Sequence, residues 1–300
     1  MCYAFVMTDR LDVLKTYKLF IDGKFPRSES GRSLPVNDRR GALYAHLCLA
    51  SRKDLRDAVE AARKAQSGWS AATSYNRGQI LYRMAEMMEG RRAEFAAAID
   101  VRGAKSGRSG AAMHSSEEVK ISVDRLVSYA GWADKYAQIL GCNNPVSGPF
   151  YNFTVPEPSG VIAVIAPDSP ALLGLISLLA PVIVSGNTAI VISGETNPIP
   201  AALLGEVFAT SDLPPGVVNI LTGTRAELLS HVSTHRDIDG VHAAGIGADH
   251  AKTLRTGVAE NLKRVKVIDD VDFADSKWWG SAWRIEPFVE MKTMWHPASV

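Results

Sequence analysis

The second half of the chain repeats one pattern, a short apolar run followed by a segment of helical length. The apolar runs are Val161–Ala166, Thr188–Ile192, Val217–Leu221 and Ile238–His242. The helices predicted after them span 171–184, 200–210, 225–233 and 248–264. Short apolar strands that alternate with helices are typical of a parallel sheet covered on both faces. Since such crossovers are right-handed, the sequence predicts an α/β fold with Rossmann-like layering.

The first half predicts helices with a few short strands. We expect strands at Lys18–Asp22 and Lys24–Pro26 around a turn at Asp22-Gly23. Ser51 is the predicted N-cap of a helix, with Asp54 three residues later. The helical segments predicted from apolar spacing are 55–66, 76–98 and 117–140. Strands are predicted at 150–155 and 288–295, and a solvated loop, with phosphate binding as the alternative, at 102–110.

Composition limits the partners and the compartment. A net charge of +1 gives no general attraction to nucleic acid or to an anionic membrane. The apolar stretch 171–192 contains Pro181 and Gly186, so a helix followed by a buried strand explains it better than a membrane span. The three cysteines, Cys2, Cys48 and Cys142, are widely spaced and form no metal-binding motif. A cytoplasmic protein without a metal site or disulfide framework is therefore expected.

Candidate ligand contacts follow the strands, because ligands of such sheets lie outside the carboxyl ends of the strands. Pro167 and Asp168 follow the first strand, and Glu195 follows the second. Gly223 and Gly245 follow the third and fourth strands, where glycine lets a ligand approach the backbone. Glu195 is suited to accept hydrogen bonds from ribose hydroxyls. The alternative for each position is an ordinary loop residue.

Several of these segments resemble the aldehyde dehydrogenase superfamily. The matching segments are Pro214-Pro215-Gly216-Val217-Val218-Asn219 with Thr222-Gly223, Gly186-Asn187-Thr188 leading to Glu195, Glu157-Pro158-Ser159-Gly160-Val161, and Glu260-Asn261-Leu262-Lys263-Arg264. The resemblance implies a dinucleotide-binding domain over residues 1–140 and 157–266. It also implies that residues 141–156 and 286–300 are strands used for oligomerisation.

The departures from the family pattern concern its chemistry. The Trp-Asn pair that donates to the oxyanion is Asp168-Ser169 here, and the Lys that contacts the adenosine ribose is Ile192. The second glycine of the phosphate-contact motif is replaced by His250. No cysteine follows Cys142, and the stretch 265–287 is too short for a catalytic domain, since a compact domain needs about 50 residues or more.

The resemblance therefore implies a scaffold without its catalytic domain and without a catalytic residue. Glu195, Gly223, Gly245 and Pro167 remain as vestigial cofactor contacts, so NAD binding is expected to be weak or lost. We expect a non-catalytic structural or regulatory subunit that assembles with itself or with a full-length aldehyde dehydrogenase. The alternative is an NAD-dependent oxidoreductase that acts on aldehydes with residues supplied by a partner. The imidazoles near the sheet are interpreted as packing or surface residues (His231, His235, His242 and His250).

Overall fold

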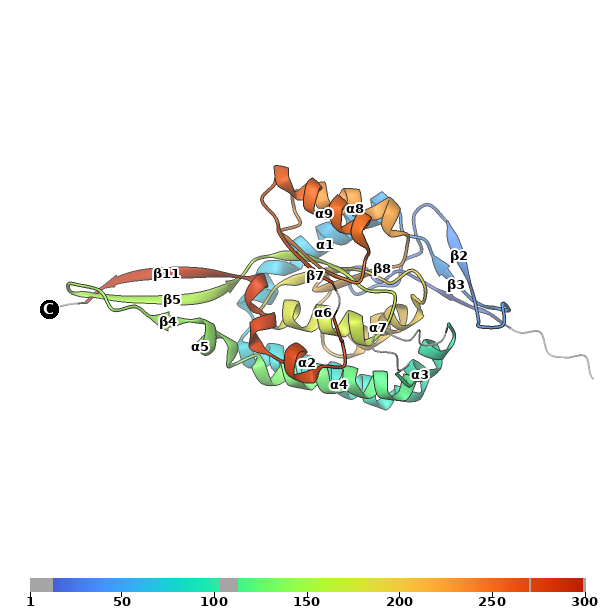
Figure 1. The fold of residues 1–300 in the computed structure, drawn as a ribbon, viewed down its shortest axis with the longest axis horizontal. Helices are drawn as coiled ribbons and strands as arrows, with labels where there is room; N and C mark the ends of the chain where they lie inside the picture. Colours follow the sequence, from blue (N-terminus) through green and yellow to red (C-terminus); the bar gives the residue numbers. More distant parts are fainter. Residues whose placement is uncertain (1–12, 103–112, 270, 299–300) are drawn as a thin grey trace, which may run out of the picture.

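The computed structural model describes residues 13–102, 113–269 and 271–298. Its centre is a five-stranded sheet in the order β10-β9-β6-β7-β8 (Figure 1). The strands are β6 (Val161–Ile165), β7 (Thr188–Ile192), β8 (Val218–Leu221), β9 (Gly240–Ala244) and β10 (Arg264–Ile268). Every neighbouring pair runs parallel. The predicted α/β fold with a Rossmann-like parallel sheet is confirmed.

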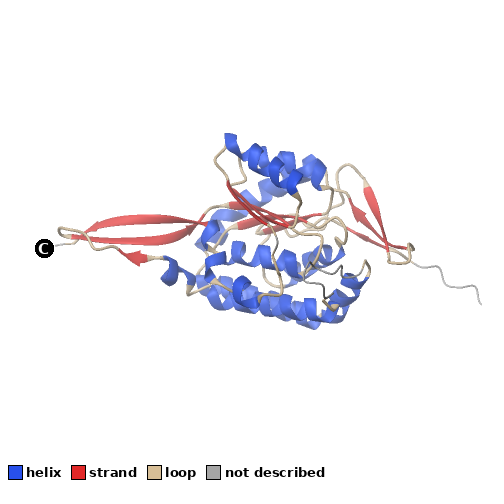
Figure 2. Ribbon diagram, viewed as in Figure 1, coloured by secondary structure: helices blue, strands red, loops and turns tan. Residues whose placement is uncertain are grey.

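Helices cover both faces of this sheet, as Figure 2 shows. One face carries α1 (Arg52–Ala71), α8 (Arg225–Thr234) and α9 (Ala248–Gly257). The other carries α2 (Ser74–Gly90), α4 (Ser115–Trp132), α6 (Leu173–Val184) and α7 (Ile199–Thr210). The four strands β6 to β9 are buried at every position, because their side chains point into one or the other helical layer.

The predicted cap of α1 is confirmed in detail. The Ser51 hydroxyl accepts hydrogen bonds from the backbone N–H groups of Lys53 and Asp54. The Asp54 carboxylate accepts in return from the Ser51 N–H at 2.8 Å and from the Ser28 hydroxyl at 2.7 Å. This reciprocal arrangement satisfies the free donors of the first turn. It also ties the N-terminal segment to the start of the helix.

Two of the long helices predicted in the first half are each divided in the structure. The segment 76–98 forms α2 and then α3 (Arg92–Asp100), with the break at Arg91 directly after Gly90. The segment 117–140 forms α4 and a short α5 (Tyr136–Leu140). Glycine is a weak helix former, and its position marked the first break. Residues 103–110 of the predicted loop lie outside the described part of the chain.

The N-terminal strands differ from the prediction. The structure has β1 (Lys15–Tyr17), β2 (Ser33–Asn37) and β3 (Leu43–Cys48) in a sheet of order β1-β3-β2. The segment predicted as a hairpin forms only isolated bridges, Phe20 to Ile220 and Ile21 to Lys24. The Phe20 bridge attaches this segment to β8, so pairing across the fold replaced the local hairpin that the turn residues suggested.

The predicted helix 248–264 was wrong at its end. Helix α9 stops at Gly257, and after a short 3₁₀ turn (Val258–Glu260) the chain forms β10, which pairs with β9. A Cβ atom on Gly257 would lie 2.1 Å from the Ser233 hydroxyl oxygen, so the position admits glycine alone without a shift of that side chain. The alternation of Val265 and Val267 with polar residues is the strand signal that the prediction overlooked.

A three-stranded antiparallel sheet, here called the arm, extends away from the body (Figure 1). It consists of β4 (Cys142–Asn143), β5 (Phe150–Pro158) and β11 (Val289–Pro297) in the order β11-β5-β4. Strands β5 and β11 pair along their full length, from Val289 opposite Pro158 to Pro297 opposite Phe150. The strands predicted at 150–155 and 288–295 are confirmed, and β4 was not predicted.

The segment that joins β10 to the arm, here called the linker (269–288), is compact. Apart from residue 270 it is described, and it contains α10 (Ser276–Trp279) and two 3₁₀ turns (Ala282–Arg284 and Glu286–Phe288). Trp279 is fully buried and stacks on Phe273 with ring centroids 5.0 Å apart. Tyr129 of α4 donates to the Trp279 carbonyl at 2.6 Å. The linker is therefore packed onto α4 as part of the core.

Candidate functional site

The carboxyl edge of the sheet is where a ligand of this fold is expected. From β6 the chain adds β7 and β8 on one side, and then β9 and β10 on the other. The strand order therefore reverses between β6 and β9, and ligands of such sheets bind outside the carboxyl ends of the strands at this switch point. Four loops, 166–172, 193–198, 222–224 and 245–247, form this edge.

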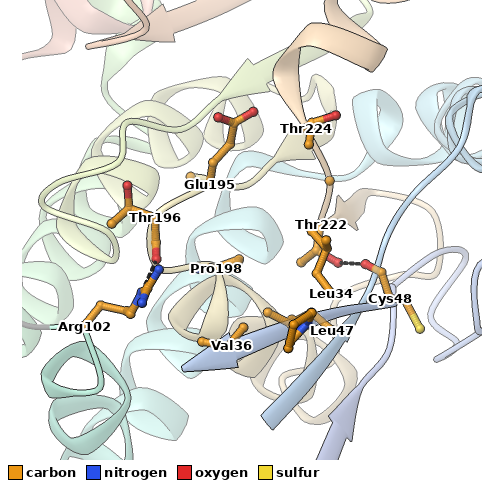
Figure 3. Close-up of a pocket in the computed structure, with 13 residues that line it drawn as sticks. Leu34, Val36, Leu47, Cys48, Arg102, Glu195, Thr196, Pro198, Thr222 and Thr224 are labelled. Carbon is orange, nitrogen blue, oxygen red and sulfur yellow. Dashed lines mark hydrogen bonds between the residues drawn. The ribbon is translucent and has the colours of Figure 1, made fainter. Parts of the chain in front are cut away.

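Glu195 and Gly223 both line a cavity of about 170 Å³ (Figure 3), and Pro167 and Gly245 are not among its lining residues. That these four residues contact a cofactor stays a prediction. Strands β2 and β3 close it with Leu34, Val36 and Leu47. Thus one wall of the cavity comes from the N-terminal sheet, which the sequence did not predict. The cavity is polar near Glu195 and apolar near β2 and β3.

The Glu195 carboxylate takes part in the chain's own structure. Its Oε1 accepts the backbone N–H of Arg225, the first residue of α8, at 2.5 Å. A carboxylate at this position satisfies a free donor and complements the positive end of the helix. Figure 3 shows the carboxylate pointing away from Val36 and Leu47. Glu195 therefore serves as a cap of α8 in this structure, a role that its position in the sequence did not indicate.

Asp168 joins the loops that follow β6 and β7. Its Oδ1 accepts the backbone N–H of Glu195 at 2.7 Å and that of Thr196 at 3.3 Å. Burial acts to raise the pKa of Asp168, but the hydrogen bonds and charge of Arg225 outweigh it, so the pKa lies below its ordinary value. Asp168 is thus held as a carboxylate, and it binds its neighbours as an acceptor.

Arg225 was missed by the sequence reasoning, and it is the central side chain of this edge. It is 3% exposed. Its guanidinium makes two bonds to Asp168, Nη1 to Oδ2 at 3.1 Å and Nη2 to Oδ1 at 3.0 Å, and Nη2 also donates to the Ala166 carbonyl at 2.6 Å. A signal was present in the sequence, because an acid after one strand and a base after another meet at the same edge of a parallel sheet.

Pro167 and Gly245 lie against each other on the β9 side of the edge. A Cβ atom built on Gly245 would be 3.2 Å from the Pro167 Cβ, and the backbone at Gly245 has a positive φ of 61°. Gly194 is constrained by space alone, since its Cβ would meet the Pro167 carbonyl oxygen at 2.5 Å. The loop after β6 therefore packs closely onto the loops after β7 and β9.

The remaining positions named from the sequence are separate from the cavity. Ile192 is completely buried in β7 and belongs to the core beneath α1 and α8. The described residues that line the cavity include none of the four histidines. The His250 Nδ1–H donates to the Ile246 carbonyl just before α9, and the His242 Nδ1–H donates to the Leu178 carbonyl inside the core.

The described residues hold neither a metal-binding cluster nor a membrane-spanning helix. Across 13–102, 113–269 and 271–298, no three His, Cys, Asp or Glu side chains are grouped so as to hold a metal ion. Over the same residues, no helix combines the length and apolarity needed to cross a membrane. The apolar helix α6 has 12 residues and includes Pro181. Cys48 and Cys142 are both free thiols.

The sheet order and the polar loops at its carboxyl edge define a Rossmann-like α/β protein with an antiparallel arm. The model of the aldehyde dehydrogenase family matches residues 26–267. Aldehyde dehydrogenase, cytosolic 1 of Elephantulus edwardii is 32% identical over 253 residues, which make up 83% of this chain and 49% of that protein. Retinal dehydrogenase 2 of Mus musculus is 33% identical over 257 residues, 84% of this chain and 48% of that protein.

Solved structures agree with this assignment. An aldehyde dehydrogenase mutant from Bacillus cereus has a TM-score of 0.77 at 25% identity, over 85% of this chain and 51% of that one. A mutant of aldehyde dehydrogenase C from Pseudomonas syringae, in complex with NAD⁺ and octanal, has a TM-score of 0.73 at 27% identity, over 84% of this chain and 50% of that one. The chain belongs to the aldehyde dehydrogenase family, and it spans about half the length of the curated relatives it matches.

Proposed function

We propose that this chain is a non-catalytic subunit, structural or regulatory, that assembles through the arm with a second chain of the aldehyde dehydrogenase type. The second chain is either a copy of itself or a full-length aldehyde dehydrogenase. We also place the protein in the cytoplasm, which agrees with the free thiols of Cys48 and Cys142. The observation that carries the proposal is the arm, a paired sheet built from two distant segments and left largely exposed.

The arm exposes the groups that protein interfaces use. Phe150 and Trp295 contact each other edge to face at 5.8 Å and remain 44% and 60% exposed. Tyr151 and Met294 lie on the opposite face of the same sheet and are also exposed. Within the described residues β11 has a pairing strand on one side only, so its other edge carries free backbone groups. Exposed aromatic residues and an open edge favour docking of a partner strand or sheet.

The linker supports the non-catalytic part of the proposal. Aldehyde oxidation by a thiohemiacetal route needs a thiolate, donors for the oxyanion and a base. Between β10 and β11 the chain has no cysteine, and the described part of that segment is packed onto α4. Asp168 and Ser169 stand where the resemblance places the oxyanion donor, and Asp168 is ion-paired with Arg225. We therefore assign no catalytic residue to this chain.

We further propose that NAD binding is weak or lost. One oxygen of the Glu195 carboxylate, Oε1, already accepts the Arg225 N–H, and Ile192 offers neither charge nor donor. The cavity beside Glu195 and Gly223 measures about 170 Å³, whereas pockets for drug-sized ligands measure about 300–1,000 Å³. The residues present thus do not fit a dinucleotide in this conformation, and we derive no hydride-transfer step here.

One observation favours the alternative of an oxidoreductase completed by a partner. The relative from Pseudomonas syringae was solved with NAD⁺ and octanal, and its structure matches this chain over 84% of the residues. An assay of NADH formation from NAD⁺ and an aldehyde separates the two functions. Our proposal predicts no turnover by the purified chain. Turnover by the chain alone would contradict it, and a mixture that turns over faster than the partner alone would favour the alternative.

The assembly is tested with matched tryptophan variants. Trp295 on the arm and Trp283 in the linker are 60% and 54% exposed. We expect the wild-type chain to form dimers or larger species in sedimentation velocity, alone or after mixing with a full-length aldehyde dehydrogenase. The double variant Phe150→Thr/Trp295→Thr should be a monomer in both experiments, and Trp283→Thr should behave as wild type. A wild-type monomer that ignores the homologue contradicts the proposal.

A further inference from the structure

Two side chains tie together the loops after three successive strands of the sheet. Asp168, after β6, binds the backbone of Glu195 and Thr196, after β7. Arg225, after β8, binds Asp168 and the Ala166 carbonyl at the end of β6. Because β7 lies between β6 and β8, the Arg225 side chain spans the carboxyl end of β7 to reach β6.

This connection lies at the position where a dinucleotide is expected. The switch point of the sheet is between β6 and β9, and the Arg225 guanidinium covers the last carbonyl of the β6 side. The β9 side is covered by Pro167, which packs against Gly245. A ligand that approaches the backbone at the switch point therefore meets an arginine from the neighbouring helix and a proline ring.

The guanidinium has little freedom to move aside. It is buried, and its Nη1 and Nη2 groups are bonded to a carboxylate and a carbonyl in a fixed planar arrangement. The Arg225 Nε is buried without a hydrogen-bond partner, so the bonds of Nη1 and Nη2 are what hold the guanidinium in place. Removal of one partner from a buried charge pair is costly, because the remaining charge is left without compensation.

We propose that Arg225 determines whether this edge of the sheet accepts a dinucleotide, and that its pair with Asp168 keeps the edge closed. The inference rests on the proposed loss of NAD binding, and it adds the Arg225 side chain to the causes given there. In this account the scaffold retains the shape of a dinucleotide site. The arginine occupies the space next to β6 that the phosphates and the nicotinamide ribose would otherwise approach.

The test is a gain of binding. We would titrate NAD⁺ and ADP-ribose into the wild-type chain, Arg225→Gly and Arg225→Lys by isothermal calorimetry. Wild type should show no saturable binding up to millimolar ligand. Arg225→Gly should bind both ligands at least about tenfold more tightly, since no buried ion pair has to be broken. Arg225→Lys should bind both ligands more weakly than Arg225→Gly, because lysine keeps the positive charge and part of the length of the side chain.

A control and a second variant keep the test decisive. Arg125 is a buried arginine of α4 that binds the Ser177 hydroxyl and the Phe273 carbonyl, so Arg125→Lys should leave NAD⁺ binding as in wild type. If Arg225→Gly does not fold, Asp168→Asn removes one anchor and should give a smaller gain. Wild-type binding as tight as that of the variants overturns the inference, as does a folded Arg225→Gly or Asp168→Asn that gains nothing. Sedimentation of the same samples measures assembly through the arm separately. A failure of the Arg225 inference can therefore be told apart from a failure of the proposed function.

Discussion

The body and the arm of this molecule differ in where their groups find partners. In the body, charged and polar groups at the carboxyl edge are paired within the chain, with Arg225 and Asp168 as the clearest case. In the arm, the aromatic side chains of Phe150 and Trp295 contact each other and are otherwise exposed. Arg225 and Asp168 thus already have partners within the chain, whereas the exposed aromatic side chains of the arm leave surface that a partner could cover.

The largest expected effect tests whether the linker belongs to the body. Trp279→Ala removes a fully buried indole that stacks on Phe273 and lies near Arg125. We expect the free energy of unfolding to fall by about 3–5 kcal/mol, as for other large-to-small changes of aromatic residues in a core. Urea unfolding measures it, with Trp283→Ala as the exposed control. Equal, small losses for both variants would mean that the linker is a loose connection and not part of the core.

The next effect tests the pairing at the carboxyl edge. Asp168→Ala leaves the Arg225 guanidinium buried without its carboxylate. A fully buried pair broken in this way costs about 3–5 kcal/mol. We expect a loss of about 2–3 kcal/mol in the free energy of unfolding, because the Asp168 side chain is 37% exposed.

Chemical denaturation of Asp168→Ala and of Asp168→Ala/Arg225→Leu measures this loss. The double variant should recover part of the loss; a double variant as unstable as the sum of two single losses would contradict the pairing.

A pH effect of similar size is expected from His242 in the body. Burial lowers the pKa of His242 from 6.5 to about 3, so below pH 6.5 the unfolded chain takes up a proton that the folded chain does not. Stability from this group is complete above pH 6.5 and is lost as the pH falls towards 3. At pH 5 the loss is about 2 kcal/mol, because each unit costs about 1.4 kcal/mol. Denaturation at pH 7.5 and at pH 5 should show this loss of stability in the wild type and not in His242→Leu. An equal loss in the two proteins would contradict the prediction.

The smallest effect is expected in the arm. Lys292 and Glu157 form an ion pair of 2.5 Å, and their side chains are 58% and 46% exposed. Glu157→Gln should change the free energy of unfolding of the monomer by less than about 1 kcal/mol, because exposed pairs are screened by water and salt. Urea unfolding of Glu157→Gln and of Asp168→Ala, both at low protein concentration, measures the two losses of stability. A loss as large as that of Asp168→Ala would remove the contrast between body and arm.

The sequence predicted the body better than it predicted the site. Strands β6 to β9 are largely apolar and bounded by Gly and Pro residues, so the alternation with helices could be recognised locally. The strand β10 and the sheet β1-β3-β2 were missed, because their pairing is decided by distant segments such as β9 for β10. Breaks in long helices, as at Arg91, depend on packing as well as on the adjacent Gly90.

For the site, two of the four predicted contacts, Glu195 and Gly223, line one cavity because both follow strands of one sheet, while Pro167 and Gly245 lie outside it. It did not predict that the Glu195 carboxylate would cap α8, nor that Arg225 would reach across β7. Side-chain reach and pairing depend on the three-dimensional spacing of loops, which a linear pattern does not specify. The charges of Asp168 and Arg225 on the same sheet edge were nevertheless visible, and such pairs should be sought in related chains.

Hydrogen–deuterium exchange tests the contrast between body and arm most directly. Backbone amides of β11 and of the loops 166–168 and 193–196 would be followed at low and high protein concentration, with and without NAD⁺. We predict that β11 gains protection as the concentration rises or when a full-length aldehyde dehydrogenase is added, while NAD⁺ leaves the loops unchanged. Protection of the loops by NAD⁺ with no response in β11 would contradict the account.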